Sequence, residues 1–196
     1  MRKLIALLCA AMVSVGALAV DVYEIDKDHS SANFTVRHMM VSNVHGRFTQ
    51  VSGTISYDEK DVTKSSVTAV IKTASINTDN GSRDQHLRSA DFFDTGKFPL
   101  ATFKSTRVEK RDKGLVAIGD LTIKGVTKQV EMPFEISKAN TPFGVRIGVN
   151  ATLKINRQDF GVKYNETLDN GGLAVGNEVT LDLNVEARPA KPAERK

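Results

Sequence analysis

The chain has 196 residues, of which 40% are hydrophobic, and it contains one cysteine and no tryptophan. Its formal net charge is +4, and the basic residues are scattered along the sequence. They form no basic cluster interleaved with aromatic residues, so the composition argues against nucleic acid as a partner. The length is enough for one domain with a sizeable hydrophobic core.

The beginning of the chain has the three parts of a secretory signal peptide, namely a positive start, an apolar run and the small-x-small sequence ALA at residues 17–19. The apolar run ends at Asp21 and is shorter than the roughly 18 residues that span a bilayer. We therefore expect residues 1–19 to be removed and the mature protein to be periplasmic. Removal also takes away Cys9, so the mature chain can form no internal disulfide.

Residues 20–188 are expected to form a single domain. The last residues, 189–196, read PAKPAERK. A short terminal segment that is rich in proline and charge buries too little apolar surface to fold. We therefore predict a disordered tail at residues 189–196.

Most of the mature chain has the pattern of half-buried β-strand, in which side chains alternate between two faces. At residues 145–155 every odd position is apolar and no even position is, as a sheet with one dry face and one wet face requires. Turns are predicted at residues 43–46 and 112–114, and Pro133 indicates a strand edge, a bulge or a strand end. Strands are predicted at residues 30–38, 48–57, 66–78, 101–111, 115–123, 130–136, 145–155 and 179–185.

One stretch, residues 81–99, does not alternate, and its sequence is GSRDQHLRSADFFDTGKFP. It combines two arginines, three aspartates, a histidine and three phenylalanines. We predict a short helix at residues 83–90 with Ser82 as its N-cap, followed by a loop. The stretch is expected to be an insertion around which the β-structure closes.

Seven or eight antiparallel strands must hide their edges, either by closing into a barrel or by stacking as a sandwich. An eight-stranded barrel can be filled by its own side chains or can hold one small ligand. The predicted inward positions carry mostly Ala, Val, Ser, Thr and Ile, and the chain has no Trp. Small inward side chains favour a hollow barrel.

A series of motifs runs through almost the whole mature chain. They are DHS at 28–30, FxVxH at 34–38, GxF at 46–48, INT at 76–78, RDxHLxSxDFF at 83–93, FPxATFxS at 98–105, GDLTIKGVT at 119–127 and NRxDFG at 156–161. In order and spacing this series resembles the YceI-like family of periplasmic polyisoprenoid-binding proteins. The resemblance implies an all-β, extended antiparallel eight-stranded lipocalin-like barrel with one short helix and an apolar tunnel. It also implies a homodimer that binds an isoprenoid quinone, an isoprenoid phosphate or a long-chain fatty amide.

Polar residues near the ends of the predicted strands and in the insertion are candidates for contact with a lipid head group. For Arg83 and Asp84, the alternative is a structural ion pair that closes one end of the barrel. Arg157 and Asp159 share the parity of the inward residues, so they are expected to face the interior and pair there, because a buried charge needs a partner. The head-group candidates are His38, Arg83, Asp84, His86, Arg157 and Asp159. The residues predicted to line the tunnel are Phe34, Val36, Phe92, Phe93, Ile147 and Val149.

Catalysis is the rival class of function. The four histidines, at positions 29, 38, 45 and 86, have no HxH or HExxH spacing, and a zinc site needs three convergent ligands. The GxSxG elbow of a serine hydrolase does not occur in the sequence. We therefore predict no catalytic residue, no metal site and no cofactor.

The sequence thus predicts a non-enzymatic periplasmic carrier of a long-chain isoprenoid-type lipid, either an isoprenoid quinone or a polyprenyl phosphate. The carrier would be a homodimer that contacts the inner membrane transiently. Two alternatives stay open. One is a stress-response protein that binds a fatty acid or a fatty amide, and the other is an interaction protein whose barrel is packed and holds no ligand.

Overall fold

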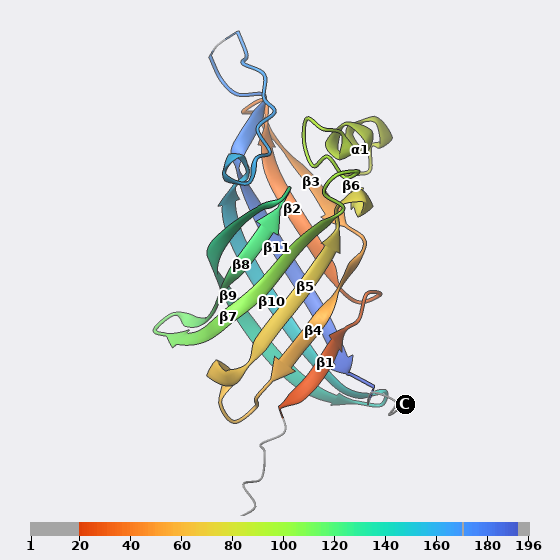
Figure 1. Ribbon diagram of the computed structural model, residues 1–196, viewed down its shortest axis with the longest axis vertical. Coiled ribbons are helices and arrows are strands. Elements are labelled where there is room, and N and C mark those ends of the chain that lie inside the picture. The colour runs from red at the N-terminus through yellow and green to blue at the C-terminus, as the bar shows by residue number, and fades with distance from the viewer. Residues whose placement is uncertain (1–19, 170, 192–196) are drawn as a thin grey trace, which may run out of the picture.

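The computed structural model describes residues 20–169 and 171–191. The predicted signal peptide, residues 1–19, and residues 192–196 of the predicted tail lie outside the described residues. The described chain forms an elongated β-barrel with a short helix over one end, which we call the upper end and which is at the top of Figure 1. No helix in this part of the chain is long and apolar enough to cross a membrane.

The described residues form eleven strands, one α-helix and three short 3-10 helices. In chain order these elements are β1 (Asp21–Ile25), β2 (Ser31–His38), β3 (Ser42–Phe48), β4 (Val51–Tyr57), η1 (Val62–Lys64), β5 (Ser66–Lys72), η2 (Thr73–Ser75), β6 (Ile76–Asn77), α1 (Gly81–Arg88), β7 (Leu100–Arg111), β8 (Gly114–Ile123), β9 (Val126–Thr141), β10 (Gly144–Asn156), η3 (Arg157–Phe160) and β11 (Val175–Pro189).

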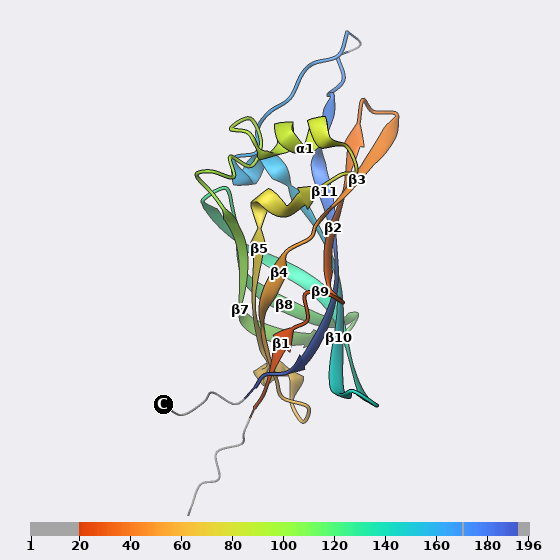
Figure 2. The same cartoon turned by 90° about the vertical axis from the view of Figure 1, so that its right-hand side faces the viewer.

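The strands occupy eight positions around a closed wall. Antiparallel neighbours follow the order β1-β4-β5-β7-β8-β9-β10-β11, and β1 pairs with β11 to close the barrel, with Tyr23 opposite Pro189. Towards the upper end β11 pairs with β2 instead, so β1 and β2 occupy one wall position in succession. In the same way β3 and β4 share one position, and β5 and β6 share another (Figure 2). The predicted eight-stranded barrel is confirmed.

The first hairpin turns earlier than the sequence predicts. Residues 43–46 are part of strand β3, and the chain turns at Met39 and Met40, whose φ angles are 49° and 61°. Gly46 is required for packing, because a Cβ atom at this position would lie 2.3 Å from Cζ of Phe34. The turn prediction is wrong because asparagine and glycine, which are common turn residues, here belong to a strand.

Pro133 lies in the middle of β9, at the point where β9 separates from β10. Its register partner in β8 is Val116, whereas the pairing of β9 with β10 ends at Phe134, opposite Ala151. Proline has no N–H for a strand ladder, so it suits a position that is unpaired on one side. Of the three predicted alternatives, the structure shows a strand edge, because this part of β9 pairs only with β8. Beyond this point η3 packs beside the separated part of β9.

The insertion at residues 81–99 covers the upper end, as Figures 1 and 2 show. Helix α1 spans Gly81–Arg88, and its N-cap is Asn80, whose Oδ1 accepts a hydrogen bond of 3.0 Å from the backbone N–H of Arg83. The prediction of a helix at 83–90 capped by Ser82 is therefore two residues too late. Asparagine and serine cap helices about equally well, so the residue types do not distinguish the two starts.

The opposite, lower end of the barrel is closed by side chains of the wall itself. Tyr23, Ile55, Ile147 and Ala187 form a buried set, which we call the lower cluster. Ile147 and Ala187 are both 0% exposed. Above the lower cluster, the inward residues of the barrel surround a hollow.

Candidate functional site

An apolar cavity of about 240 Å³ lies inside the barrel. Its lining extends from Val62 of η1 and Ser66 of β5 to Leu87 of α1, and most of its side chains are apolar. Arg157 is the one charged side chain of the described residues in this lining. A hollow of this kind offers apolar contact along its length and one charged group near its upper end.

Five of the six residues predicted to line the tunnel border this cavity, and they are Phe34, Val36, Phe92, Phe93 and Val149. Ile147, the sixth, lies in the lower cluster instead. Its side chain faces inward like that of Val149, but the barrel is filled at the level of Ile147 by Tyr23, whose ring meets that of Tyr57 edge-on at 6.5 Å. The alternation of side chains along a strand predicts whether a residue points into the barrel, but not at which level along the barrel axis it lies.

The cavity is covered at the upper end by the segment that follows α1. Phe93 packs edge-on against Phe48 at 5.6 Å between ring centroids, and Phe48 packs in turn against Phe34 at 5.9 Å. Phe92 is 7% exposed and belongs to the main core. The inserted segment is thus joined to the wall by aromatic contacts that also border the hollow.

Arg83 and Asp84 do not pair with each other, and both hold Thr78. One carboxylate oxygen of Asp84 accepts hydrogen bonds from the backbone N–H and the hydroxyl of Thr78, at 2.8 and 2.6 Å. Nε of Arg83 donates to the hydroxyl of Thr78 at 2.8 Å, and Nη2 donates to its carbonyl at 2.9 Å. Neither side chain is part of the cavity lining. This geometry is that of a brace for the turn before α1, and the alternative of a direct ion pair does not hold.

His86 belongs to a polar and aromatic group on the upper surface. Its Nε2 lies 2.9 Å from Oδ2 of Asp91, and its ring meets those of Phe92 and Tyr164 edge-on at 5.0 and 4.9 Å. The hydroxyl of Tyr164 donates to Glu166 at 2.8 Å, and this hydrogen bond raises the pKa of Tyr164 above its usual value. His86 is therefore separated from the cavity by the ring of Phe92, at the rim of the covered end.

Arg157 is 5% exposed and uses all its N–H groups on the protein. Nε donates to the carbonyl of Gly176 at 2.9 Å, and Nη1 donates to those of Val162 and Tyr164 at 2.7 and 2.8 Å. Nη2 donates to the carbonyl of Val175 at 3.1 Å and is 3.5 Å from Oδ1 of Asn177.

Burial lowers the pKa of Arg157 below its usual value, and no carboxylate of the described residues forms an ion pair with the guanidinium. Arg157 therefore connects η3, the loop after it and β11, and it places a positive charge beside the cavity.

Asp159 does not face the interior, contrary to the prediction. Its side chain is 52% exposed, and its carboxylate lies 4.0 Å from Nζ of Lys128 on β9. The expected pair of Arg157 with Asp159 is therefore wrong. The strand ends at Asn156 and the chain enters η3, so the alternation of inward and outward positions no longer applies to Asp159.

His38 is half-buried at the upper end of β2, in register with Val175 of β11 and Ser42 of β3. It is not among the residues that line the cavity. Of the six head-group candidates, only Arg157 borders the hollow directly. His86 reaches its rim through Phe92, and the other four lie outside it.

The barrel, the covering insertion and the apolar cavity can be compared with known proteins. The sequence profile of the YceI-like domain matches residues 23–187. The chain belongs to the YceI-like family. Protein YceI of Escherichia coli strain UMN026 is 40% identical over 179 residues, which cover 89% of this chain and 91% of that protein.

Two solved structures show the same YceI-type barrel. BcnA of Burkholderia cenocepacia has a TM-score of 0.74 at 24% identity, covering 84% of this chain and 99% of that one. A polyisoprenoid binding domain from Saccharophagus degradans, implicated in plant cell wall breakdown, has a TM-score of 0.65 at 18% identity, covering 86% and 98%. The fold of this YceI-like chain is therefore the YceI-type β-barrel.

In this YceI-like protein two residues of the upper end were not singled out as site residues from the sequence. The hydroxyl of Thr78 donates a hydrogen bond to Asp84 and accepts one from Arg83. Its position in the INT motif is the sequence feature that could have identified it. Tyr164 lies after η3, in a region without periodicity, and nothing in its local sequence indicates that it meets His86. The contact arises only because the loop after η3 folds over the insertion.

Proposed function

We propose that the protein is a non-enzymatic periplasmic carrier that holds the chain of an isoprenoid-type lipid inside its barrel. The observation that carries this proposal is the apolar cavity, which is lined mostly by apolar side chains from nearly every strand of the wall. Ligand sites are typically concave and apolar with a few polar groups that fix orientation. Membership of the YceI-like family supports the same function.

The physical basis of such binding is the burial of apolar surface. Burying a lipid chain is worth about 0.8 kcal/mol for each CH₂-sized group. A long chain therefore binds even after the cost of immobilisation is met. No covalent step and no cofactor are needed, because affinity comes from the chain and the protein only has to exclude water from it.

The charge at the upper end supports an anionic head group. Arg157 is buried beside the cavity, and its donors are all directed to uncharged oxygens. Backbone dipoles satisfy its hydrogen bonds but leave its net charge uncompensated, and a buried charge is stabilised by an opposite one. Of the two candidate lipids, polyprenyl phosphate provides that charge and an isoprenoid quinone does not.

The proposal includes transient contact with the inner membrane through the tip of the β2–β3 hairpin. Met39, Met40 and Val41 at this tip are 40%, 58% and 76% exposed. Both methionines have positive φ, a conformation that costs roughly 1–2 kcal/mol for a residue with a side chain. Exposed apolar residues held at such a cost do not serve the stability of the barrel, and their position at the upper end suits insertion into a lipid surface.

The proposal also includes a homodimer. At the lower end the turn between β9 and β10 carries Phe143, which is 84% exposed. Large exposed aromatic side chains are enriched in protein interfaces relative to the rest of a surface. This turn is therefore where we place the contact between two copies.

Native mass spectrometry of protein purified from its own periplasm tests the carrier function and the assembly together. We expect a dimer with one isoprenoid-type lipid for each chain, to be identified after extraction. A bound fatty acid or fatty amide would replace the proposed lipid class. An empty protein that takes up neither polyprenyl phosphate nor quinone would overturn the carrier function.

A matched pair of substitutions on β10 tests the cavity itself. Val149 lines the cavity, whereas its neighbour Asn150 points to the outer surface. Val149→Trp is expected to abolish lipid binding without loss of the fold, because the indole fills the hollow. Asn150→Trp is expected to bind as the unchanged protein does. Equal binding by both variants would show that the lipid does not occupy this cavity.

A further inference from the structure

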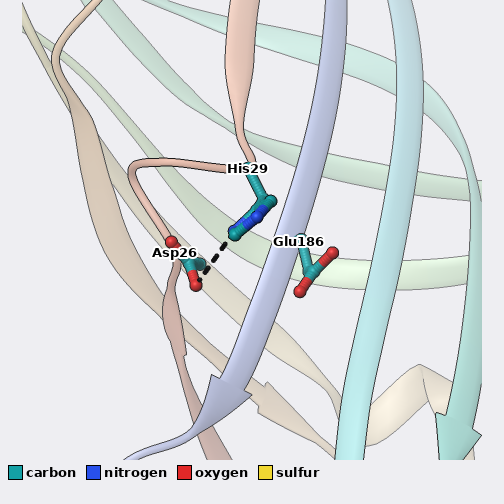
Figure 3. Close-up of side chains that lie close together, drawn as sticks. All are labelled: Asp26, His29 and Glu186. Carbon is teal, nitrogen blue, oxygen red and sulfur yellow. Dashed lines mark ion pairs between the residues drawn. The ribbon is translucent and has the colours of Figure 1, made fainter. Parts of the chain in front are cut away.

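A second group of chemically capable side chains is not part of the cavity lining. Asp26, His29 and Glu186 each present one potential metal-ligand atom, and these three atoms all lie within 4.8 Å of one another. Asp26 and His29 are in the turn between β1 and β2, and Glu186 is on β11 (Figure 3). They bring together one imidazole and two carboxylates.

The spacing of these atoms suits a small tetrahedral cation. Zinc binds nitrogen and oxygen at about 2.0–2.2 Å, so two ligands of one tetrahedral ion are about 3.4 Å apart. Nδ1 of His29 lies 3.4 Å from Oδ2 of Asp26, which is longer than the usual 2.7–3.2 Å of a hydrogen bond. The side chain of Glu186 is 37% exposed, so it has room to rotate towards the other two.

The backbone around the group is fixed by hydrogen bonds between the turn and β11. The backbone N–H of Asp26 donates to the carbonyl of Glu186 at 2.8 Å. The hydroxyl of Ser30 donates to the same carbonyl and accepts from the N–H of Glu186, both at 3.1 Å. The ligands therefore come from two segments that are already joined, and little ordering is needed to bind an ion.

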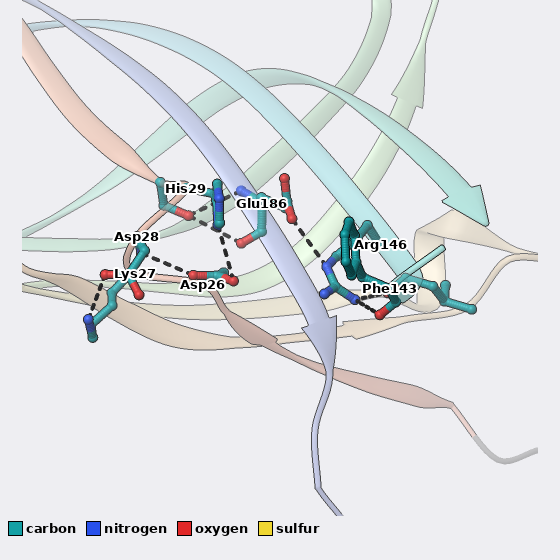
Figure 4. Close-up of polar contacts among 9 residues, drawn as sticks. Asp26, Lys27, Asp28, His29, Phe143, Arg146 and Glu186 are labelled. Atoms are coloured by element: carbon teal, nitrogen blue, oxygen red, sulfur yellow. Dashed lines mark hydrogen bonds and ion pairs between the residues drawn. The ribbon is translucent and has the colours of Figure 1, made fainter. Parts of the chain in front are cut away.

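The side chains are also oriented by neighbours (Figure 4). The N–H of Asp28 donates to Oδ1 of Asp26 at 3.0 Å, and Nε of Arg146 lies 3.2 Å from Oε1 of Glu186. Carboxylates that bind metals are commonly held by such outer hydrogen bonds. In each case one oxygen is held and the other is left for a ligand.

We propose that Asp26, His29 and Glu186 form a zinc site with a fourth position open to water. The donor set of imidazole and carboxylate suits zinc. The site lies where β11 changes its partner from β1 to β2, since Ile25 pairs with Ala187 and Ser31 pairs with Asn184. A bound ion would connect the turn between β1 and β2 to β11. It would therefore stabilise the barrel at the point where the wall passes from β1 to β2.

Isothermal titration calorimetry with zinc chloride, on the purified protein without an affinity tag, tests this site. We expect one Zn²⁺ for each chain and a higher Tm in the presence of zinc, because an ion that binds only the folded state stabilises it. Magnesium at the same concentration is expected to leave the Tm unchanged, since it prefers octahedral oxygen ligands.

The decisive variant is His29→Ala, which removes the nitrogen ligand from an exposed turn. It is expected to weaken zinc binding by more than about 100-fold, because even outer-shell partners contribute about 10–100-fold. His45→Ala is the matched control, since His45 is exposed on β3 and contacts Thr35. Glu186→Gln keeps the size of the side chain and is expected to lose both zinc affinity and the rise in Tm. No binding by the unchanged protein, or equal binding by the His29 variant, would overturn the proposal.

Discussion

The two ends of the barrel are closed in different ways. The lower end is filled by side chains of the wall strands, with Ile147 and Ala187 completely buried. The upper end is covered by inserted segments, namely α1 with its following loop and η3 with the loop after it (Figure 2). These segments are held largely by arginine side chains that donate to carbonyl oxygens, such as Arg157 and Arg88.

This difference indicates which end can open. Separating the lower cluster would require the wall strands themselves to part, because its side chains belong to β1, β4, β10 and β11. Lifting an inserted segment breaks a few hydrogen bonds and aromatic contacts, and the strand ladders stay intact. Local openings of low free energy are typical of such covering segments. We therefore expect lipid to pass through the upper end.

The largest effect is expected for Arg157→Met. The variant removes the guanidinium donors from the carbonyls of Val162, Tyr164 and Gly176, whereas the carbonyl of Val175 still accepts from Nδ2 of Asn165. Each buried group that is left unsatisfied is costly. We expect the free energy of unfolding, measured with urea, to fall by about 3–4 kcal/mol, and bound lipid to dissociate faster. Arg157→Lys keeps the charge but loses the planar arrangement of five N–H donors. It should therefore restore only part of the stability and only part of the slow lipid dissociation. Unchanged lipid dissociation in Arg157→Met would contradict the role of the upper end.

A somewhat smaller loss of stability is expected for Ile147→Ala in the lower cluster. Removing a buried isoleucine side chain to the β-carbon typically costs about 2–5 kcal/mol, and we expect about 3 kcal/mol by urea unfolding. The rate of lipid dissociation, measured at a temperature where the variant is fully folded, should not change. If this variant releases lipid as fast as Arg157→Met, the expectation that lipid leaves only through the upper end is wrong.

The smallest effect on stability is expected at the hairpin tip. The double substitution Met40→Ser and Val41→Ser should change the free energy of unfolding by less than about 0.5 kcal/mol. Lipid transfer to vesicles should slow by about tenfold or more, because the apolar area that enters the bilayer is lost. Val22→Ser is the control, since Val22 is 45% exposed on β1 at the lower end. Equal transfer rates for the tip variant and the Val22 variant would contradict the proposed membrane contact of the tip.

Much of the fold could be predicted from the sequence. The alternation at residues 145–155 and the motif series are properties of local sequence, and they led to the antiparallel barrel. The position of the first turn could not be predicted, because Met39 and Met40 adopt a conformation that favours glycine and asparagine.

The candidate site was less predictable, since it depends on distance along the barrel and on contacts between remote segments. Ile147 and Val149 face the same way, yet one is sealed below the cavity and the other lines it. Asp159 has the same parity as Arg157, but η3 turns it outward. Glu186 meets Asp26 and His29 only because β11 closes the barrel against β1 and β2.

The separation of β9 from β10 bears on how this protein avoids aggregation. Where the two strands part, the wall has two lengths of strand edge, and an open edge is a template for pairing with another chain. Pro133 contributes no N–H to that edge, and Phe160 of η3, which is 2% exposed, is buried beside it. The gap in the wall is thus protected against the addition of a foreign strand, although the barrel is not fully hydrogen-bonded around its circumference.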